Sequence, residues 1–134
     1  MTDLVFFYGT LMSGFRRPGR ERLEARLTPI GRGSIRAALF DVGLYPAAIP
    51  AADSSVQGEL HRMIDADAVL RELDEIEGFR PEQPDSSLYT RLQTPVTLGD
   101  GRTEMAWTYF YNAPLGNAPR IASGDYLDYL KVKH

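Results

Sequence analysis

Glu77 holds a position in this sequence that stability alone does not explain. The pattern over residues 65–77 predicts an amphipathic helix, with Asp65 at its N-cap and Gly78 directly after its last turn. On a helical wheel, Glu77 falls only about 40° from Leu73, inside the apolar stripe. Burial and the negative end of the helix dipole both disfavour a charged carboxylate, so we expect a raised pKa at Glu77. An acid perturbed in this way is suited to general acid–base catalysis.

The same wheel leaves an alternative open for Glu77. If the last turn of the helix frays, its side chain swings into water or pairs with an arginine. The other acids in the second half of this helix fall about 100° or more from Leu73, so we expect them to face solvent. They are Glu72, Asp74 and Glu75.

A short turn after the first apolar segment is the second candidate site. It consists of Tyr8, Gly9, Thr10 and Leu11. A strand that ends in Gly-Thr can direct backbone N–H groups toward a ligand, and such groups suit a carboxylate or a developing oxyanion. No Gly-Lys-Ser/Thr follows, so the turn is not a phosphate-binding loop. Many turns of this kind bind nothing, which leaves a purely structural role open.

Other residues that could do chemistry are sparse. The chain has no cysteine, which excludes a thiol nucleophile and a zinc–cysteine site. His61 has no second histidine nearby and His134 is the last residue, so we expect no metal site. No Gly-x-Ser-x-Gly elbow is present to build a serine triad. Tyr45 is either a lid residue or packing, whereas Tyr109 and Tyr111 share one side of a strand and line either the core or a binding wall.

These candidates need a scaffold, and the pattern predicts mostly strands with one clear helix. We expect strands at residues 4–8, 30–41, 56–63, 89–98 and 105–111, and short helices at 20–27 and within 123–130. Residues 98–102 contain Asp100-Gly101, which is typical of a tight hairpin turn. Residues 42–50, with two prolines, predict a constrained loop or a short edge piece, and residues 79–88 predict an exposed loop. The order indicates a small α+β domain with a barrel-like sheet.

The composition is that of one ordinary domain spanning residues 1–134. The hydrophobic fraction is 43%, the net charge is −3 and the pI is near 5.3, which argues against dedicated binding to nucleic acid or anionic membranes. No stretch approaches the roughly 20 apolar residues of a membrane helix, and no basic segment opens the chain. We therefore expect a cytoplasmic protein without a signal peptide. A local cluster of arginines is expected to form a solvated basic helix face. It comprises Arg16, Arg17, Arg20, Arg22 and Arg26.

Several segments, in this order, resemble the gamma-glutamylcyclotransferase-like superfamily and in particular its gamma-glutamylamine cyclotransferase-like branch. The matching segments are FFYGTLMSG at 6–14, LFDVGLYPAAI at 39–49, VQGELHRM at 56–63, LDEIEGF at 73–79, LYTR at 88–91 and AWTYFY at 106–111. The combination of YGTL, a later LDEIEG and a Tyr-x-Arg is far more specific than any one segment.

The resemblance implies a small mixed β-barrel flanked by one main helix and short helices. It also implies a pocket formed by the loop after the first strand and by Glu77, which becomes the expected catalytic residue. The expected substrate-binding residues are Tyr8, Gly9, Thr10, Leu11, Tyr45, Tyr89 and Tyr111.

The activity that the resemblance implies is that of a cofactor-independent enzyme of the acyltransferase or lyase type. It would release 5-oxoproline and an amine or amino acid from a small γ-glutamyl molecule, with no metal. The alternative is a non-catalytic module that binds a γ-glutamyl or similar small anionic ligand on the same fold. Residues 79–88 form a longer segment than in the most compact members of the family, and the arginine cluster has no clear family role, so the leaving group stays open. The oligomeric state stays open as well.

Overall fold

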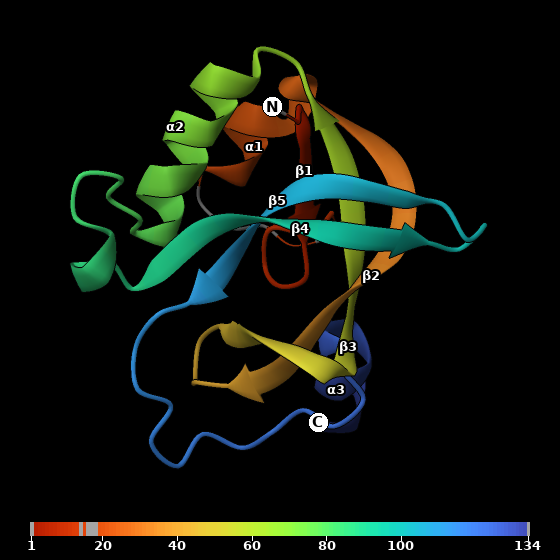
Figure 1. Ribbon diagram of the computed structural model, residues 1–134, viewed down its shortest axis with the longest axis vertical. Helices are drawn as coiled ribbons and strands as arrows, with labels where there is room; N and C mark the ends of the chain where they lie inside the picture. The colour runs from red at the N-terminus through yellow and green to blue at the C-terminus, as the bar shows by residue number, and fades with distance from the viewer. Residues whose placement is uncertain (1, 14, 16–18, 134) are drawn as a thin grey trace.

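The computed structural model describes residues 2–13, 15 and 19–133. Within these residues, strands close a barrel in the order β1–β3–β2–β4–β5 (Figure 1). The strands are β1 (Leu4–Phe7), β2 (Leu27–Asp41), β3 (Pro46–Met63), β4 (Tyr89–Leu98) and β5 (Thr103–Tyr111). The helical segments are α1 (Arg20–Leu23), α2 (Ala66–Glu77) and α3 (Tyr126–Lys133), with 3₁₀ turns η1 (Glu24–Arg26) and η2 (Pro84–Ser86). The predicted α+β class and small barrel are confirmed.

Strand β1 lies between β3 and β5 in the barrel wall, and all four of its residues are buried. It pairs antiparallel with β3 and parallel with β5, where Val5 lies opposite Trp107, so the barrel is mixed. Gly58 of β3 lies so close to β1 that an added Cβ would stand 2.2 Å from the Phe7 carbonyl oxygen. This close approach explains the glycine, and the strand directs the chain into the predicted turn.

Strands β2 and β3 are longer than the sequence predicts. Their pairing shifts abruptly, because Arg36 lies opposite Ser55 while Ala37 lies opposite Pro50. Beyond this irregularity, residues 46–50 pair with the end of β2. The prediction of a constrained loop is therefore wrong for residues 46–50, and the alternative of an extended piece is nearer to the structure. The two prolines lack N–H donors but do not prevent this pairing. Tyr45 lies in the turn that joins β2 to β3.

Helix α2 lies beside α1 at one end of the molecule, while α3 lies at the other end beside the β2–β3 hairpin (Figure 1). The apolar stripe of α2 is buried through Val69, Leu70 and Leu73. Gly78 adopts a left-handed conformation with φ of 70° and ends the helix, as predicted. Asp65 occupies the N-cap position, but it too is left-handed and its side chain makes no capping hydrogen bond.

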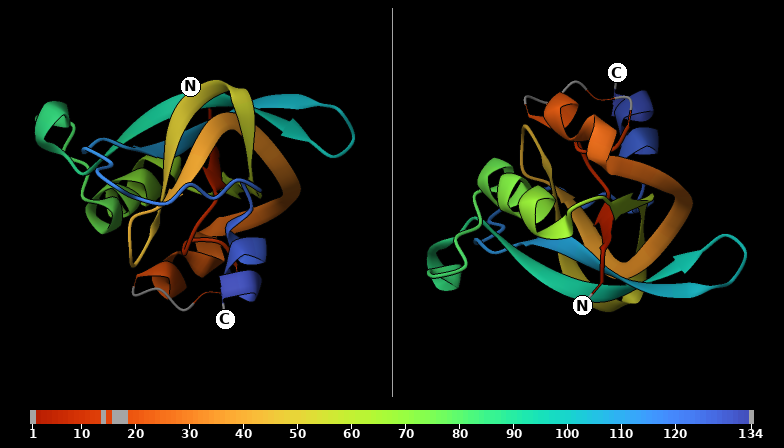
Figure 2. Two further views of the ribbon diagram at one scale, coloured as in Figure 1. Left: turned by 90° about the horizontal axis from the view of Figure 1, so that it is seen from below. Right: turned by 90° about the horizontal axis from the view of Figure 1, so that it is seen from above.

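The connections extend away from the barrel. The segment 79–88 and the β4–β5 hairpin project from opposite sides of the molecule (Figure 2). Residues 80–86 are exposed, as predicted, but Ser87 is buried and its Oγ accepts a hydrogen bond from the Arg80 backbone N–H at 2.8 Å. In the described part of the chain, no helix has both the length and the apolar character needed to cross a membrane.

Candidate active site

A cavity opens where the chain leaves β1 and turns at Gly9. Its empty volume is about 340 Å³, including the open mouth. Glu77 reaches the cavity from the last turn of α2, and residues 9–11 form part of its wall. The prediction that Glu77 and this turn share one cavity is therefore confirmed. Their chemical roles stay predictions.

The turn depends on glycine at position 9 because of a close approach, not because of its backbone angles. A Cβ on Gly9 would stand 2.7 Å from Cγ of Pro46. The Met12 N–H donates to the Gly9 carbonyl oxygen at 3.0 Å, which closes the turn. The start of β3 thus packs directly on the turn, and both line the cavity.

Two charged side chains hold the last residue of the turn and the segment that follows it. Arg20 is only 3% exposed, and its Nε–H donates to the Leu11 carbonyl oxygen at 2.9 Å. Glu59 accepts hydrogen bonds from the Ser13 backbone N–H at 2.8 Å and from the Ser13 hydroxyl. The prediction of a solvated basic face is therefore wrong for Arg20, because the turn needs a buried donor for its carbonyl.

The rest of the arginine cluster is divided by position. Arg22 is exposed, whereas Arg26 is half-buried and pairs with Glu72 at 2.9 Å. None of the described arginines of the cluster lines the cavity. Arg16 and Arg17 lie outside the described residues.

His61 of β3 packs against Phe7 of β1, with ring centroids 5.4 Å apart, and is 1% exposed. Its Nε2 lies 3.1 Å from the Glu59 carboxylate, and no described residue partners its Nδ1. Burial lowers the pKa of His61, and the nearby Glu59 carboxylate only partly opposes this. Burial alone would raise the pKa of Glu59, but hydrogen bonds from Ser13 and His61 hold it below its usual value. The ionised Glu59 carboxylate therefore binds both Ser13 and the buried, neutral His61.

Two of the tyrosines around Glu77, Tyr8 and Tyr109, are strongly held as neutral phenols. Burial raises the pKa of Tyr8 well above its usual value, and Tyr89 and the charge of Glu77 add to the shift. Burial also raises the pKa of Tyr109, with further contributions from Asp74 and Glu77. The Tyr8 hydroxyl donates to the Tyr109 carbonyl oxygen at 2.6 Å. Glu77 thus lies among phenols that do not ionise at physiological pH.

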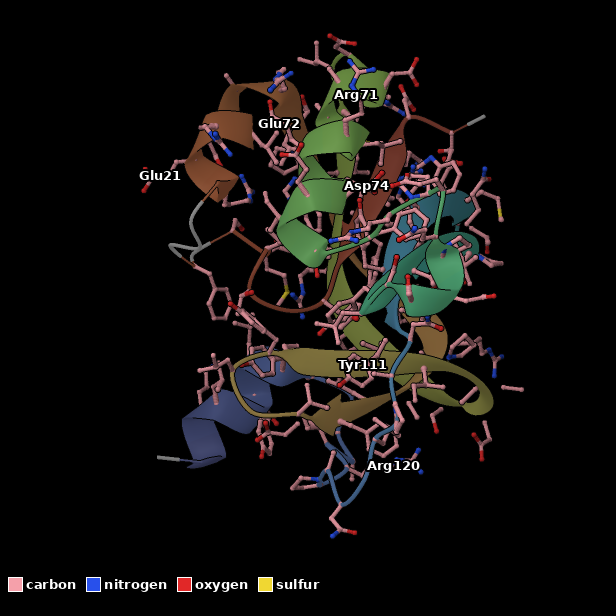
Figure 3. All side chains as sticks on the ribbon, turned by 90° about the vertical axis from the view of Figure 1, so that its left-hand side faces the viewer. Glu21, Arg71, Glu72, Asp74, Tyr111 and Arg120 are labelled. Atoms are coloured by element: carbon pink, nitrogen blue, oxygen red, sulfur yellow. The ribbon has the colours of Figure 1, made fainter. Side chains whose placement is uncertain are left out.

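Asp74 contradicts the helical wheel. It was expected to face solvent, yet it is 6% exposed and lies on the side of α2 that faces the strands, whereas Glu72 lies toward α1 (Figure 3). Its carboxylate accepts hydrogen bonds from Arg91 Nε at 2.8 Å and from the Tyr109 hydroxyl at 2.6 Å. The wheel failed because a buried acid with a matched cation and donor is stable inside a protein. The Tyr-x-Arg motif was the only sequence signal for its partner.

The remaining predicted site residues are distributed unevenly. Tyr45, which is 38% exposed, and Tyr89 line the cavity, and the Tyr89 hydroxyl donates to the Pro46 carbonyl oxygen at 2.9 Å. Among the described lining residues Tyr111 is absent and Tyr109 takes its place. Tyr111 instead packs edge-on against Tyr89, with ring centroids 5.3 Å apart. Sequence reasoning left the role of Tyr109 open.

This arrangement combines one carboxylate, one glycine turn and a set of neutral aromatic rings. No described arginine, lysine or histidine side chain lines the cavity beside Glu77. Such a site can move a proton at Glu77 while the turn binds a carboxylate or a carbonyl oxygen.

Comparison with known proteins gives consistent matches. The family model described as "Gamma-glutamyl cyclotransferase, AIG2-like" matches residues 5–128. The gamma-glutamylcyclotransferase family protein YtfP of Escherichia coli strain K12 is 33% identical over 127 residues, which cover 92% of this chain and 96% of that protein.

This chain also matches several solved structures. The solution structure of ytfP from Escherichia coli matches with a TM-score of 0.67 and 29% identity, over 94% of this chain and 97% of that one. YkqA from Bacillus subtilis matches with a TM-score of 0.74 and 22% identity, over 99% of this chain, which spans 42% of the YkqA chain. An aig2-like protein from Mus musculus matches with a TM-score of 0.69 and 21% identity, over 92% and 87%. The last two likenesses show the fold alone.

Proposed function

Because this chain belongs to the gamma-glutamyl cyclotransferase, AIG2-like family, we propose that it cyclises the γ-glutamyl part of a small molecule. The products are 5-oxoproline and an amine or amino acid. The observation that carries the proposal is the shared cavity of Glu77 and residues 9–11. It supports a site in which one acid moves protons and one turn binds an anionic group.

The reaction is intramolecular. The α-amino nitrogen of the γ-glutamyl unit attacks its own γ-carbonyl carbon, a new C–N bond closes a five-membered lactam, and the original amide C–N bond breaks. Glu77 takes a proton from the α-ammonium group and delivers it to the leaving nitrogen, while the second proton, which the α-nitrogen loses on ring closure, passes to the released amine or to water. No external nucleophile takes part, and the reaction as written requires no cofactor. The main tasks of the protein are to fold the substrate for attack and to transfer this proton.

The turn and the tyrosines supply binding. The backbone N–H groups of the turn at Gly9, Thr10 and Leu11 donate hydrogen bonds to one of two groups. This group is either the α-carboxylate of the substrate or the oxygen of the attacked carbonyl, which becomes anionic during attack. The rings of Tyr8, Tyr45 and Tyr89 form apolar walls against the carbon chain of the substrate. Tyr111 contributes to binding through Tyr89, on which it packs.

A direct assay tests the proposal. The purified protein is incubated with a panel of γ-glutamyl amines and γ-glutamyl amino acids, and 5-oxoproline and the free amine are quantified. We expect equimolar release of both from at least one class, and the preferred class identifies the leaving group. If a γ-glutamyl compound binds in calorimetry but none is converted, the chain is a binding module and the proposed reaction is wrong.

A further inference from the structure

A buried ion pair outside the cavity wall ties the end of α2 to the barrel. The Asp74 carboxylate faces Arg91 of β4 with both oxygens, at 2.8 Å from Nε and 3.2 Å from the second guanidinium nitrogen. The side chains of Asp74 and Arg91 are 8% and 15% exposed. The Tyr109 hydroxyl, from β5, completes the arrangement by donating to Asp74. One helix and two strands therefore meet at a single carboxylate.

The contacts of Arg91 hold the backbone on both sides of Glu77 in place. Asp74 lies one helical turn before it, so the two side chains point to the same face of α2. The Phe79 N–H donates to the Asp74 carbonyl oxygen at 2.8 Å, just after the helix ends. The Arg91 guanidinium lies 5.7 Å from the Phe79 ring centroid and 4.5 Å from that of Trp107. The residues before and after Glu77 are thus fastened to the same guanidinium.

Resting on the proposed function, we propose that the Asp74–Arg91 pair, together with Tyr109, is a positioning device for Glu77. It fixes the last turn of α2 against β4 and β5, and it balances the charge that Glu77 experiences. Asp74 and Arg91 act through Glu77 and do not touch substrate, whereas Tyr109 contributes its ring to the cavity wall.

The effect of the Asp74–Arg91 pair on the charge at Glu77 can be measured, because few other charged groups of the described residues face Glu77 across the cavity. The titratable groups that face it across the cavity are phenols: Tyr8 after β1, Tyr45 from the β2–β3 hairpin, Tyr89 from β4 and Tyr109 from β5. The Tyr109 hydroxyl donates to the Asp74–Arg91 pair, which contains one anion and one cation. Removing either member alone leaves the other as an uncompensated charge near Glu77, with opposite sign in the two cases.

The test is the pH dependence of kcat and KM for the wild type, Asp74→Asn, Arg91→Met and the double variant. We expect the acidic midpoint of kcat to fall by about one pH unit in Asp74→Asn and to rise by about one in Arg91→Met. The double variant returns within about 0.3 pH units of the wild type. KM changes less than about threefold, because the turn is untouched. Shifts in one direction only, or lower melting temperatures with an unshifted midpoint, overturn the proposal in favour of a structural role.

Two controls keep the test decisive. Glu75→Gln removes an exposed charge from α2 close in sequence to Glu77, and solvent screening limits its effect on the midpoint to about 0.3 pH units. Where a single variant does not fold, Asp74→Glu and Arg91→Lys retain both charges but displace them. Each is expected to lower kcat about tenfold with an unshifted midpoint, and an unchanged kcat in both contradicts the proposal.

A spectroscopic readout separates this inference from the proposed function. Titration of the Glu77 carboxyl carbon by NMR, assigned with Glu77→Gln, reports the same midpoint shifts without any substrate. If the wild type releases no 5-oxoproline but the opposite shifts appear, the positioning holds and the proposed reaction fails. If the protein is active but the shifts are absent, the reaction holds and the positioning fails.

Discussion

The two sides of the cavity are held in different ways. The helix wall, which consists of Glu77 on the last turn of α2, is braced by contacts between side chains, namely the Asp74–Arg91 pair and the Tyr109 hydroxyl. The turn wall, which consists of residues 9–11, is braced by contacts from side chains to the backbone. Arg20 donates to the Leu11 carbonyl oxygen, and Glu59 accepts from the Ser13 N–H.

The difference separates two tasks. Contacts between side chains around the helix wall can set the charge environment and the direction of one carboxylate. Contacts to the backbone around the turn wall fix the orientation of peptide groups, which is what anion binding by N–H groups requires. Damage to the helix wall should therefore appear mainly in kcat, and damage to the turn wall mainly in KM.

The largest expected effect is on the helix wall itself. Glu77→Gln keeps the volume of the side chain but cannot accept a proton, so kcat should fall by about 10² to 10⁴. The folded protein should be as stable or more stable, because a half-buried carboxylate leaves the negative end of the helix dipole. Steady-state assays and thermal melts measure both. The matched control is Glu75→Gln, on the exposed side of α2; full turnover by Glu77→Gln would refute the mechanism.

Gly9→Ala should damage the turn wall next most. The new methyl would overlap the Pro46 ring, so the turn must shift, with a loss of about 10- to 100-fold in kcat/KM and about 1–3 kcal/mol of stability. Gly99→Ala is the control, since an added Cβ there meets nothing within 4 Å. The comparison predicts that most of the loss lies in KM. A pure kcat defect in Gly9→Ala would show that the turn acts in the chemical step.

Loss of the Arg20 contact should have a smaller effect. Arg20→Gln removes the charged donor to the Leu11 carbonyl oxygen, and we expect KM to rise about three- to tenfold and stability to fall by about 1–3 kcal/mol. Arg22→Gln, an exposed neighbour on α1, should change stability by less than about 0.5 kcal/mol and leave KM unchanged. Equal effects of the two substitutions would mean that only the overall charge of α1 matters.

The smallest expected effect is on stability as a function of pH. The pKa of His61 is lower in the folded state than its usual value of 6.5, so the unfolded chain binds the extra proton first and stability is lost as pH falls through 6.5. The pKa of Glu59 is also lowered, so a further loss follows below pH 4.5. We expect the melting temperature to drop by a few degrees from pH 7 to pH 5. His61→Gln, which does not titrate, should show a smaller drop; an equal drop would assign the effect to other groups.

Local pattern was sufficient to predict much of the scaffold. Strand β4 was predicted with its observed bounds, and the end of α2 at Gly78 followed from its C-terminal signal. Residues 46–50 were harder because their pairing with β2 depends on a partner strand and not on local propensity. The wheel placed Glu77 correctly on the side of the apolar stripe but misjudged Asp74. A helical wheel uses only the residues of one helix, so it cannot include the Arg91 and Tyr109 partners that strands β4 and β5 supply to Asp74.

By itself, the sequence determined the chemistry available to this protein: no thiol, a glycine turn after a buried strand, and one acid at the end of an amphipathic helix. These features are local, because residue type and helical periodicity are enough to define them. Only the tertiary structure decided that Tyr109 and not Tyr111 lines the cavity, that Arg20 is buried under the turn, and that Asp74 faces Arg91. Each of these depends on which distant strands close the barrel, and a buried charge is stable only where that closure brings its partner.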